Sequence, residues 1–280
     1  MKKAPHFRRI FGGLAAFLTA ALMSTPAFAV LGQPVPGAIG LQAAGSQMKI
    51  RQDDFFNNML MPIAVGICIF VFILLLIIIV RFNAKANPVP SKTTHNTALE
   101  VVWTLVPVLI LTVIAIPSIH LLFYLDNNPD TQLTLRATGS QWFWTYTYPQ
   151  NGNVKLISTF VQDKDLKPGE PRLLTANNPA VLPINTNIEI ETAATDVIHS
   201  WSVPSLGVKL DAIPGRINKT WVRIDQVGTY YGQCSQLCGQ GHAYMPIEVK
   251  AVTMPEFVKW LHSEGGKTVE EIAAETSAAG

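Results

Sequence analysis

Charged residues are scarce in this 280-residue chain, because only 14% of the residues are charged whereas 49% are hydrophobic, and the formal net charge is +2. This balance argues against a wholly water-soluble protein and indicates a membrane protein with a soluble part. The sequence has no internal repeat and only three cysteines, so chemistry that depends on thiols is restricted to a few positions. The length allows one or two domains.

The N-terminus has the parts of a secretory signal peptide. Basic residues precede an apolar stretch over residues 10–23, and Ala27-Phe28-Ala29 fits the small-x-small rule for cleavage. We therefore expect residues 1–29 to be a signal peptide. A first membrane anchor is the alternative, but the apolar stretch is short, contains two glycines and leads into Pro26.

Two longer apolar segments follow, and each reaches the ~20 residues that a membrane-spanning helix needs. We expect transmembrane helices over residues 59–80 and 100–125. Prolines lie in both segments, and membrane helices tolerate them when neighbouring groups satisfy the backbone.

The segment between the two spans predicts how the chain is oriented. Residues 81–99 carry three basic side chains and no acid, so the positive-inside rule places this loop in the cytoplasm. The N-terminal segment, residues 30–58, and everything after the second span then lie in the periplasm. The chain is expected to form an out-in-out hairpin with a large exported domain.

The exported domain, residues 126–254, is expected to be all-β. Short segments of alternating or β-branched residues are separated by Asn-Gly and Pro-Gly turn signals, which is typical of a sandwich or barrel. The expected strands lie near residues 133–137, 141–148, 188–193, 197–203, 218–224 and 247–252. Residues 255–280 are expected to form a short helix followed by a mobile tail.

From Asp126 onward the chain has 16 acidic and 12 basic residues. An acidic surface suits a basic partner rather than nucleic acid. Ordinary solubility is the alternative explanation, since a small excess of acidic residues is also common on soluble domains.

Sulfur and imidazole side chains cluster in this domain. Cys234, Cys238, His242 and Met245 lie within twelve residues, and His199 lies upstream on an expected strand. Soft sulfur ligands together with imidazole suit copper or zinc, not magnesium or calcium. Glycines in the loop allow the sharp backbone turns that would bring these side chains to one point.

Three interpretations of this cluster compete. A disulfide between Cys234 and Cys238 is the default in an oxidising compartment, since Cys68 falls within the first span and fits a small apolar role. That bond would leave two histidines and a methionine without a role. Zinc prefers four strong ligands. A lone His199 on an apolar strand face is usually a satisfied core residue, but the methionine and the second histidine favour copper.

These residues also carry a family resemblance. Residues 234–245, with His199 thirty-five residues before Cys234, closely resemble subunit II of the cytochrome c oxidases, of the alphaproteobacterial type. The similarity covers nearly the whole mature chain. It includes the two-helix hairpin, the stretch Gly139-Ser140-Gln141-Trp142-Phe143-Trp144 and residues 199–216.

The resemblance implies a two-helix transmembrane hairpin followed by an all-β cupredoxin-like Greek-key barrel that holds a binuclear copper centre, CuA. The implied ligands are two bridging thiolates and two further groups for each ion. They are Cys234 and Cys238 as bridges, His199 and Met245 on one copper, and His242 with the backbone carbonyl of Gln236 on the other.

Four further residues acquire roles from the resemblance. Trp142 matches the residue at which electrons enter from cytochrome c, although β-sheet packing would explain an aromatic there equally well. Asp196 and Asp211 match segments that dock the lysine rim of cytochrome c. Glu100 matches a glutamate at the mouth of a proton-uptake channel, although Thr97-Ala98-Leu99-Glu100 also fits a capping box, which would account for the acid alone.

Gln236 departs from the family pattern. Many members carry glutamate there, and its side chain reaches a magnesium or manganese ion at the boundary with subunit I. A neutral amide oxygen brings no charge to such an ion, which counts against an interface Mg.

The expected function is that of the electron-accepting subunit of an aerobic respiratory cytochrome c oxidase in the bacterial inner membrane. Electrons from cytochrome c would pass through CuA to the haems of subunit I, where oxygen is reduced to water with proton translocation. The expected partners are cytochrome c, subunits I and III, and the lipid bilayer.

Two alternatives remain at this point. A membrane-anchored Cys-x-x-x-Cys copper chaperone or thiol reductase would need neither His242 nor Met245, and one anchor would suffice. The corresponding subunit of a quinol-fed oxidase has a similar barrel without the copper ligands.

Overall fold

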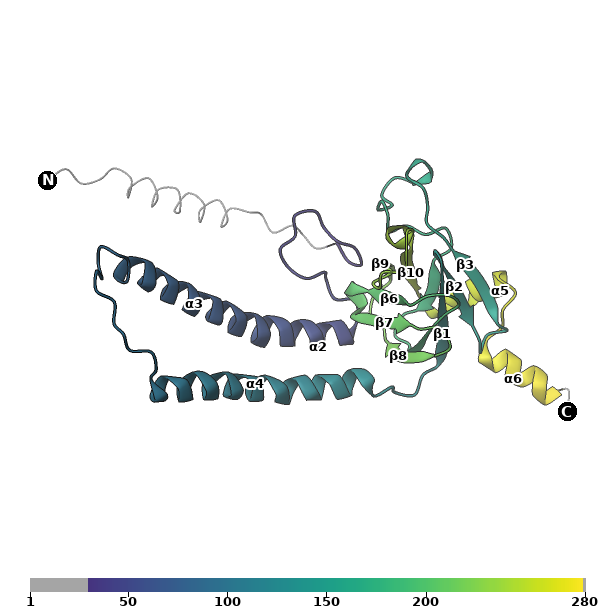
Figure 1. Cartoon of the computed structure of the whole chain (residues 1–280). Helices are drawn as coiled ribbons and strands as arrows, with labels where there is room; N and C mark the ends of the chain where they lie inside the picture. Colours follow the sequence, from purple (N-terminus) through teal and green to yellow (C-terminus); the bar gives the residue numbers. More distant parts are fainter. Residues whose placement is uncertain (1–29, 279–280) are drawn as a thin grey trace.

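The computed structural model describes residues 30–278, so the predicted signal peptide over residues 1–29 lies outside the described part. Two long helical arms form a hairpin, and a β-domain lies at the open end of the hairpin (Figure 1). The two-helix arrangement followed by an all-β domain confirms the predicted fold class.

The first arm is a continuous run made of α2 (Gln47–Phe55), the π-helical turn η1 (Phe56–Leu60) and α3 (Met61–Arg81). The second arm is α4 (Thr97–Asp126). Both arms are long and apolar enough to cross a membrane. Their apolar side chains are largely exposed, as expected for surfaces that meet lipid or another chain.

The first arm begins at Gln47, well before the span predicted over residues 59–80. Ser46 is its N-cap, because the Ser46 side chain accepts a hydrogen bond from the backbone N–H of Lys49. Met48 and Lys49 are buried against the β-domain. This polar first part of the helix is held by contacts with the β-domain. It was not predicted because the prediction was based on apolar segments alone.

The second arm corrects one prediction about capping. The N-cap of α4 is Asn96, whose side-chain oxygen accepts from the N–H of Leu99 at 3.1 Å, so Thr97 is already inside the helix. Glu100 lies in the first turn, where an acid faces the positive end of the helix dipole.

The β-domain consists of three small sheets with the strand orders β3-β2-β1-β5-β8, β4-β10-β9 and β6-β7. The strands of the first sheet are β1 (Leu133–Ser140), β2 (Phe143–Tyr148), β3 (Val154–Ser158), β5 (Ile188–Ala194) and β8 (Asn218–Val222). The other sheets contain β4 (Ala180–Pro183), β9 (Gly228–Gln233) and β10 (Pro246–Val252), and β6 (His199–Val203) with β7 (Val208–Ala212). The short helical turns are η2 (Asp163–Asp165), η3 (Pro204–Leu206) and η4 (His242–Tyr244). All six expected strand regions contain a strand, whereas β3, β4, β7 and β9 were not predicted.

The core lies between these sheets and is rich in aromatic side chains. Trp144, Tyr146 and Tyr148 alternate along β2, and all three are fully buried. The Tyr148 hydroxyl donates to the carbonyl of Val181 and accepts from the N–H of the same residue, at 2.8 and 2.9 Å. These two bonds join β2 to β4 and leave the buried hydroxyl satisfied.

The C-terminal segment forms two helices, α5 (Met254–Ser263) and α6 (Val269–Ala278). Helix α5 lies where the short helix was expected, and α6 lies within the segment for which no helix was expected. Thr268 and Glu271 form a capping box, since the Glu271 carboxylate accepts from Thr268 N and the Thr268 hydroxyl accepts from Glu271 N. The Thr-x-x-Glu spacing that starts this helix was overlooked because the segment is small and polar.

The segment before the hairpin crosses the β-domain. The carbonyl of Gly32 accepts from the N–H of Tyr231 at 2.7 Å, and Gly45 N donates to the carbonyl of Ser205 at 2.8 Å. A Cβ atom on Gly32 would lie 2.1 Å from the carbonyl oxygen of Thr229, so only glycine fits this approach to β9. This contact supports the strand that leads directly into Cys234.

Candidate metal centre

The loop over residues 234–245 connects β9 to β10, and the pairing of these strands determines its shape. Gln233 pairs with Pro246 at the ends of the two antiparallel strands. One residue further on, the N–H of Cys234 donates to the carbonyl of Met245 at 3.0 Å. The first and last members of the sulfur cluster therefore meet at the base of the loop. Both side chains are buried, with exposures of 5% and 1%.

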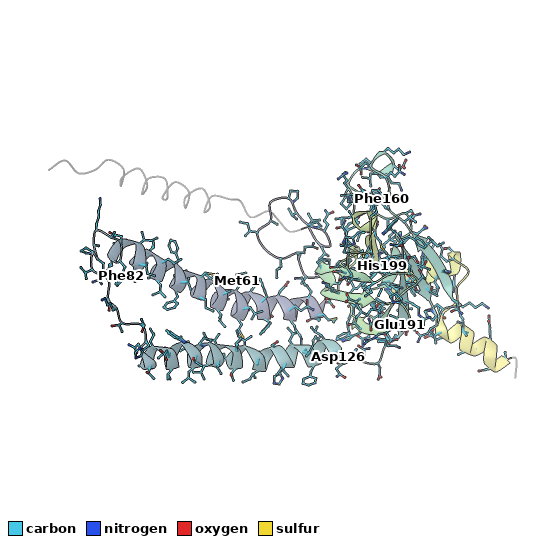
Figure 2. The ribbon with its side chains drawn as sticks, in the orientation of Figure 1. Met61, Phe82, Asp126, Phe160, Glu191 and His199 are labelled. Carbon is cyan, nitrogen blue, oxygen red and sulfur yellow. The ribbon has the colours of Figure 1, made fainter. Side chains whose placement is uncertain are left out.

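His199 reaches the same point from the start of β6. The backbone of β6 lies against the chain near Cys234, because Ser235 N donates to Ser200 O at 3.0 Å. A Cβ on Gly232 would lie 1.9 Å from the carbonyl oxygen of Ser202, so glycine permits the close approach of β9 to β6. The position of His199 within the β-domain can be followed in Figure 2.

The possible ligand atoms lie close together. The sulfurs of Cys234 and Cys238 are 3.8 Å apart, and Nδ1 of His199 lies 3.9 Å from the Cys234 sulfur. These three ligand atoms all lie within 4.8 Å of one another. Nδ1 of His242 lies 3.5 Å from the Cys238 sulfur, and the carbonyl oxygen of Gln236 lies 3.3 Å from the Cys234 sulfur.

The two thiols are free cysteines in this structure. Their separation of 3.8 Å is far longer than the roughly 2.05 Å of a disulfide bond. Burial raises the pKa of the Cys238 thiol to about 12, and the adjacent Cys234 adds to the rise. Without a cation the Cys238 sulfur stays protonated, and a bound metal ion would replace that proton.

A carboxylate fixes the orientation of the His199 ring. Asp196 Oδ1 lies 2.9 Å from Nε2 of His199, so Nδ1 is the ring nitrogen that faces the sulfurs. Burial alone would raise the pKa of the Asp196 carboxyl. Hydrogen bonds from His199 and from the backbone N–H groups of Val197 and Gln141 outweigh burial and hold that pKa below its usual range. A carboxylate behind a metal-binding histidine is the usual second partner of such a ring.

Trp142 belongs to the turn between β1 and β2, and its side chain contacts the metal loop over residues 234–245. Its indole Nε1–H donates to the carbonyl oxygen of Cys238 at 3.1 Å. A Cβ on Gly241 would lie 2.4 Å from the indole ring, which shows how closely the ring meets the loop. Trp142 is partly buried, whereas Trp144 is fully buried in the core.

The remaining predicted site residues lie elsewhere. Asp211 is exposed on β7, where it pairs with Ser200 in the strand register. Glu100 lies at the start of α4, at the far end of the hairpin from the β-domain (Figure 1). Gln236 has an exposed side chain, while its carbonyl oxygen faces the cysteine.

Sequence reasoning missed two contacts of this site. It assigned Asp196 to the docking of a partner, but the three-residue spacing between Asp196 and His199 could have indicated a shared turn. It gave the side chain of Gln141 no role, yet Nε2 of Gln141 donates to Cys238 O at 2.9 Å. Nothing in the sequence indicates this last contact.

The donor set fits copper. Two buried thiols, an imidazole with its second nitrogen held by a carboxylate, and a buried thioether form a soft, dry ligand group. Such a set is unsuited to magnesium or calcium, which require oxygen ligands.

Comparison with known proteins identifies the family of this chain. Residues 133–252 match the family described as cytochrome c oxidase subunit II, periplasmic domain, and residues 34–121 match the one described as cytochrome c oxidase subunit II, transmembrane domain. A Rickettsia felis chain named probable cytochrome c oxidase subunit 2 is 42% identical over 232 residues, covering 83% of this chain and 73% of that one.

A further relative comes from Cereibacter sphaeroides. Its cytochrome c oxidase subunit 2 is 37% identical over 269 residues, covering 90% of this chain and 88% of the relative. The crystal structure of the periplasmic domain of subunit II of cytochrome oxidase from Bradyrhizobium japonicum shares 44% identity. The matched region covers 50% of this chain and 97% of the Bradyrhizobium japonicum chain, with a TM-score of 0.47. Because both regions match subunit II models and the Cereibacter sphaeroides relative matches along most of both chains, this chain belongs to the cytochrome c oxidase subunit II family.

Proposed function

We propose that this chain receives electrons from cytochrome c at a binuclear copper centre and passes them to the haems of subunit I in a respiratory oxidase. The observation that carries the proposal is the pair of unbonded buried sulfurs, Cys234 and Cys238, 3.8 Å apart beside the Nδ1 atom of His199. Two thiolates at this separation can bridge two ions. The donor haem would be oxidised from ferrous to ferric by one electron, the bound copper couple would be reduced by the same electron, and no bond would be made or broken in this chain.

The proposed ligand set is the one that the family resemblance implies, and the grouping of His199 with the two cysteines supports it. Cys234 and Cys238 would hold both copper ions, His199 and Met245 would complete the ligands of one, and His242 with the carbonyl of Gln236 would complete those of the other. When bound, the copper pair supplies a one-electron redox couple shared between two metals. The protein supplies a rigid cage, because the loop is held at its base by the pairing of β9 with β10.

Trp142 is proposed as the residue at which electrons enter. Its indole is partly exposed and is hydrogen-bonded directly to the backbone of a proposed ligand, Cys238. An aromatic ring in that position can reach from the protein surface to the metal loop. Asp196 and Asp211 are proposed to attract the basic rim of the donor, which would depend on ionic strength.

Glu100 is proposed to lie at the mouth of a proton-uptake channel in subunit I. The basic loop over residues 81–99 supports, by the positive-inside rule, a cytoplasmic location for this end of the hairpin and a periplasmic location for the β-domain at the inner membrane. Subunits I and III and the lipid bilayer are proposed to cover the exposed apolar side chains of both arms. The neutral side chain of Gln236 counts against an interface magnesium ion.

Membership of the subunit II family argues against a copper chaperone or thiol reductase. Such a protein would need neither a second spanning helix nor Met245, which is 1% exposed and whose carbonyl accepts from the N–H of Cys234.

The test is electron paramagnetic resonance combined with a metal count on the purified, copper-loaded chain. Two coppers per chain with hyperfine splitting from two equivalent nuclei would support the proposal. A single copper, or a Cys234–Cys238 disulfide under all loading conditions, would contradict it.

A further inference from the structure

The turn between β1 and β2 is attached to the metal loop by more than the indole of Trp142. Gln141, the residue before it, donates from side-chain Nε2 to the carbonyl oxygen of Cys238 at 2.9 Å. Trp142 Nε1 donates to the same oxygen at 3.1 Å. One backbone carbonyl of a proposed ligand therefore accepts hydrogen bonds from two consecutive side chains.

The backbone of the turn is held from the other side. The N–H of Gln141 donates to Asp196 Oδ2 at 2.7 Å, while Oδ1 of the same carboxylate lies 2.9 Å from Nε2 of His199. The turn is thus hydrogen-bonded to the loop that carries Cys238 and to the acid that orients His199. Within the described residues 30–278, Gln141 takes part in both connections, through its side chain and through its backbone.

Packing leaves little room beside these bonds. A Cβ atom on Gly239 would lie 3.0 Å from Nε2 of Gln141 and 3.2 Å from the Trp142 ring. The loop and the turn are therefore in direct contact at the point where the amide donates. If the Gln141 amide were removed, the Trp142 indole would be the remaining side-chain donor to the carbonyl of Cys238.

We propose that Gln141 is a positioning residue that holds the Trp142 indole against the Cys238 backbone, so that the path for electron transfer has a fixed geometry. The proposal rests on the proposed function for the role of Trp142. Gln141 acts through Trp142 and Cys238 and binds neither the metal nor the donor protein. The competing explanation is that an exposed glutamine at this rim contributes to docking of the electron donor.

The kinetic test uses the purified oxidase complex with Gln141→Met, which removes the amide while keeping length and neutrality. Gln240→Met is the matched control, because Gln240 is an exposed glutamine on the metal loop that the turn carrying Gln141 contacts. Stopped-flow measurement of copper reduction at saturating cytochrome c isolates the transfer step from docking. We expect Gln141→Met to slow that step about 10- to 100-fold, because a displacement of the indole by roughly 1 Å would have an effect of this size. The KM for cytochrome c should stay unchanged. A raised KM with an unchanged rate at saturation would assign Gln141 to docking and overturn the proposal.

A second measurement needs no copper. In the metal-free full-length chain labelled with ¹⁵N-tryptophan, the indole N–H signal of Trp142 is assigned by its loss in Trp142→Phe. Gln141→Met should speed hydrogen exchange of this indole about five- to tenfold, the effect of weakening one hydrogen-bonded contact, whereas Gln240→Met should not. Unchanged exchange in Gln141→Met would overturn the proposal even if that variant failed to load copper. If the wild-type chain lacked a binuclear signal while Gln141→Met still sped exchange, the proposed function would fail and the positioning contact would stand.

Discussion

Asp196 and His199 share a hydrogen bond of 2.9 Å that leaves Nδ1 of the imidazole facing the sulfur of Cys234 at 3.9 Å. The acid lies three residues before the histidine, just ahead of β6, so a short stretch of chain sets the orientation of the ring. The contact gives Asp196 a second possible role. Besides attracting a basic partner, the acid can orient the His199 ring, and the two roles predict different effects when Asp196 is replaced.

Replacement of Asp196 should weaken copper binding. Asp196→Leu removes both acceptor oxygens, and we expect copper affinity to fall about 10- to 100-fold in a chelator competition assay, as for other outer partners of metal ligands. Asp196→Asn retains an acceptor oxygen and should lose less. Asp211→Asn is the control, since it removes an exposed acid from the neighbouring strand β7. If both Asp196 variants kept normal affinity and only raised the KM for cytochrome c, orientation of His199 would not be the role of this acid.

A methyl group at position 241 should disturb the contact between loop and turn. Gly241→Ala would place Cβ 2.4 Å from the Trp142 ring, so either the indole or the loop must move. We expect a loss of about 1–3 kcal/mol in the free energy of unfolding, together with slower copper reduction by cytochrome c. Gly40→Ala is the matched control, because no atom lies within 4 Å of the added Cβ. Equal stability and equal reduction rates for the two variants would show that the loop adapts freely.

The stability of the β-domain should depend on pH through Glu191. This side chain is 8% exposed and lies 2.7 Å from Arg136 and 2.9 Å from Lys219. Burial works to raise the Glu191 pKa, but hydrogen bonds from Lys219 and Arg136 outweigh it, and the net pKa lies below the usual range.

A depressed pKa in the folded state stabilises the protein above the unfolded-state pKa, about 4.3, and the benefit is lost as pH falls through the folded value. Glu191→Gln should therefore lower unfolding stability by about 1–2 kcal/mol at pH 7 and by little at pH 3. Urea unfolding of the full-length chain in detergent, followed by near-UV circular dichroism, measures this difference. Glu189→Gln, which loses a contact to Lys219 alone, should show a smaller effect. A difference between Glu191→Gln and wild type that grew toward acid pH would have the wrong sign.

Glu100 should matter for turnover and not for electron acceptance. We expect Glu100→Ala to slow steady-state oxygen consumption while copper reduction by cytochrome c stays unchanged, because the residue lies in the first turn of α4, remote from the metal loop. Asn96→Ala is an informative control, since Asn96 supplies the capping oxygen of this helix. It should cost about 1 kcal/mol of helix stability without slowing turnover. Normal turnover in Glu100→Ala would leave the acid with a helix-dipole role alone.

Residues that follow a period or a motif could be predicted from the sequence. The apolar spans, the aromatic alternation along β2 and the convergence of His199 with the cysteine pair all correspond to such patterns. Strands β4 and β9 could not, because β4 is four residues long and β9 contains two glycines, so neither has an alternation that stands out. Their positions come from pairing with β10, which is a long-range contact.

Hydrogen bonds made by single side-chain atoms could not be predicted from the sequence either. The amide of Gln141 meets Cys238, ninety-seven positions away in the sequence, and the hydroxyl of Tyr148 meets both backbone groups of Val181. Such bonds depend on how two strands approach each other, which no local pattern encodes.

The attachment of residues 31–46 to the β-domain constrains the biogenesis of the protein. Gly32 and Gly45 bind backbone groups of Tyr231 and Ser205, although the two-helix hairpin separates these partners in the sequence. In the proposed membrane orientation, both flanks of the hairpin would have to reach the same side of the bilayer before these contacts could form. A molecule that had moved only one flank across would lack the hydrogen bonds of Gly32 to Tyr231 and of Gly45 to Ser205, and we expect β9 and the loop that follows it to be less firmly held until the second flank arrives.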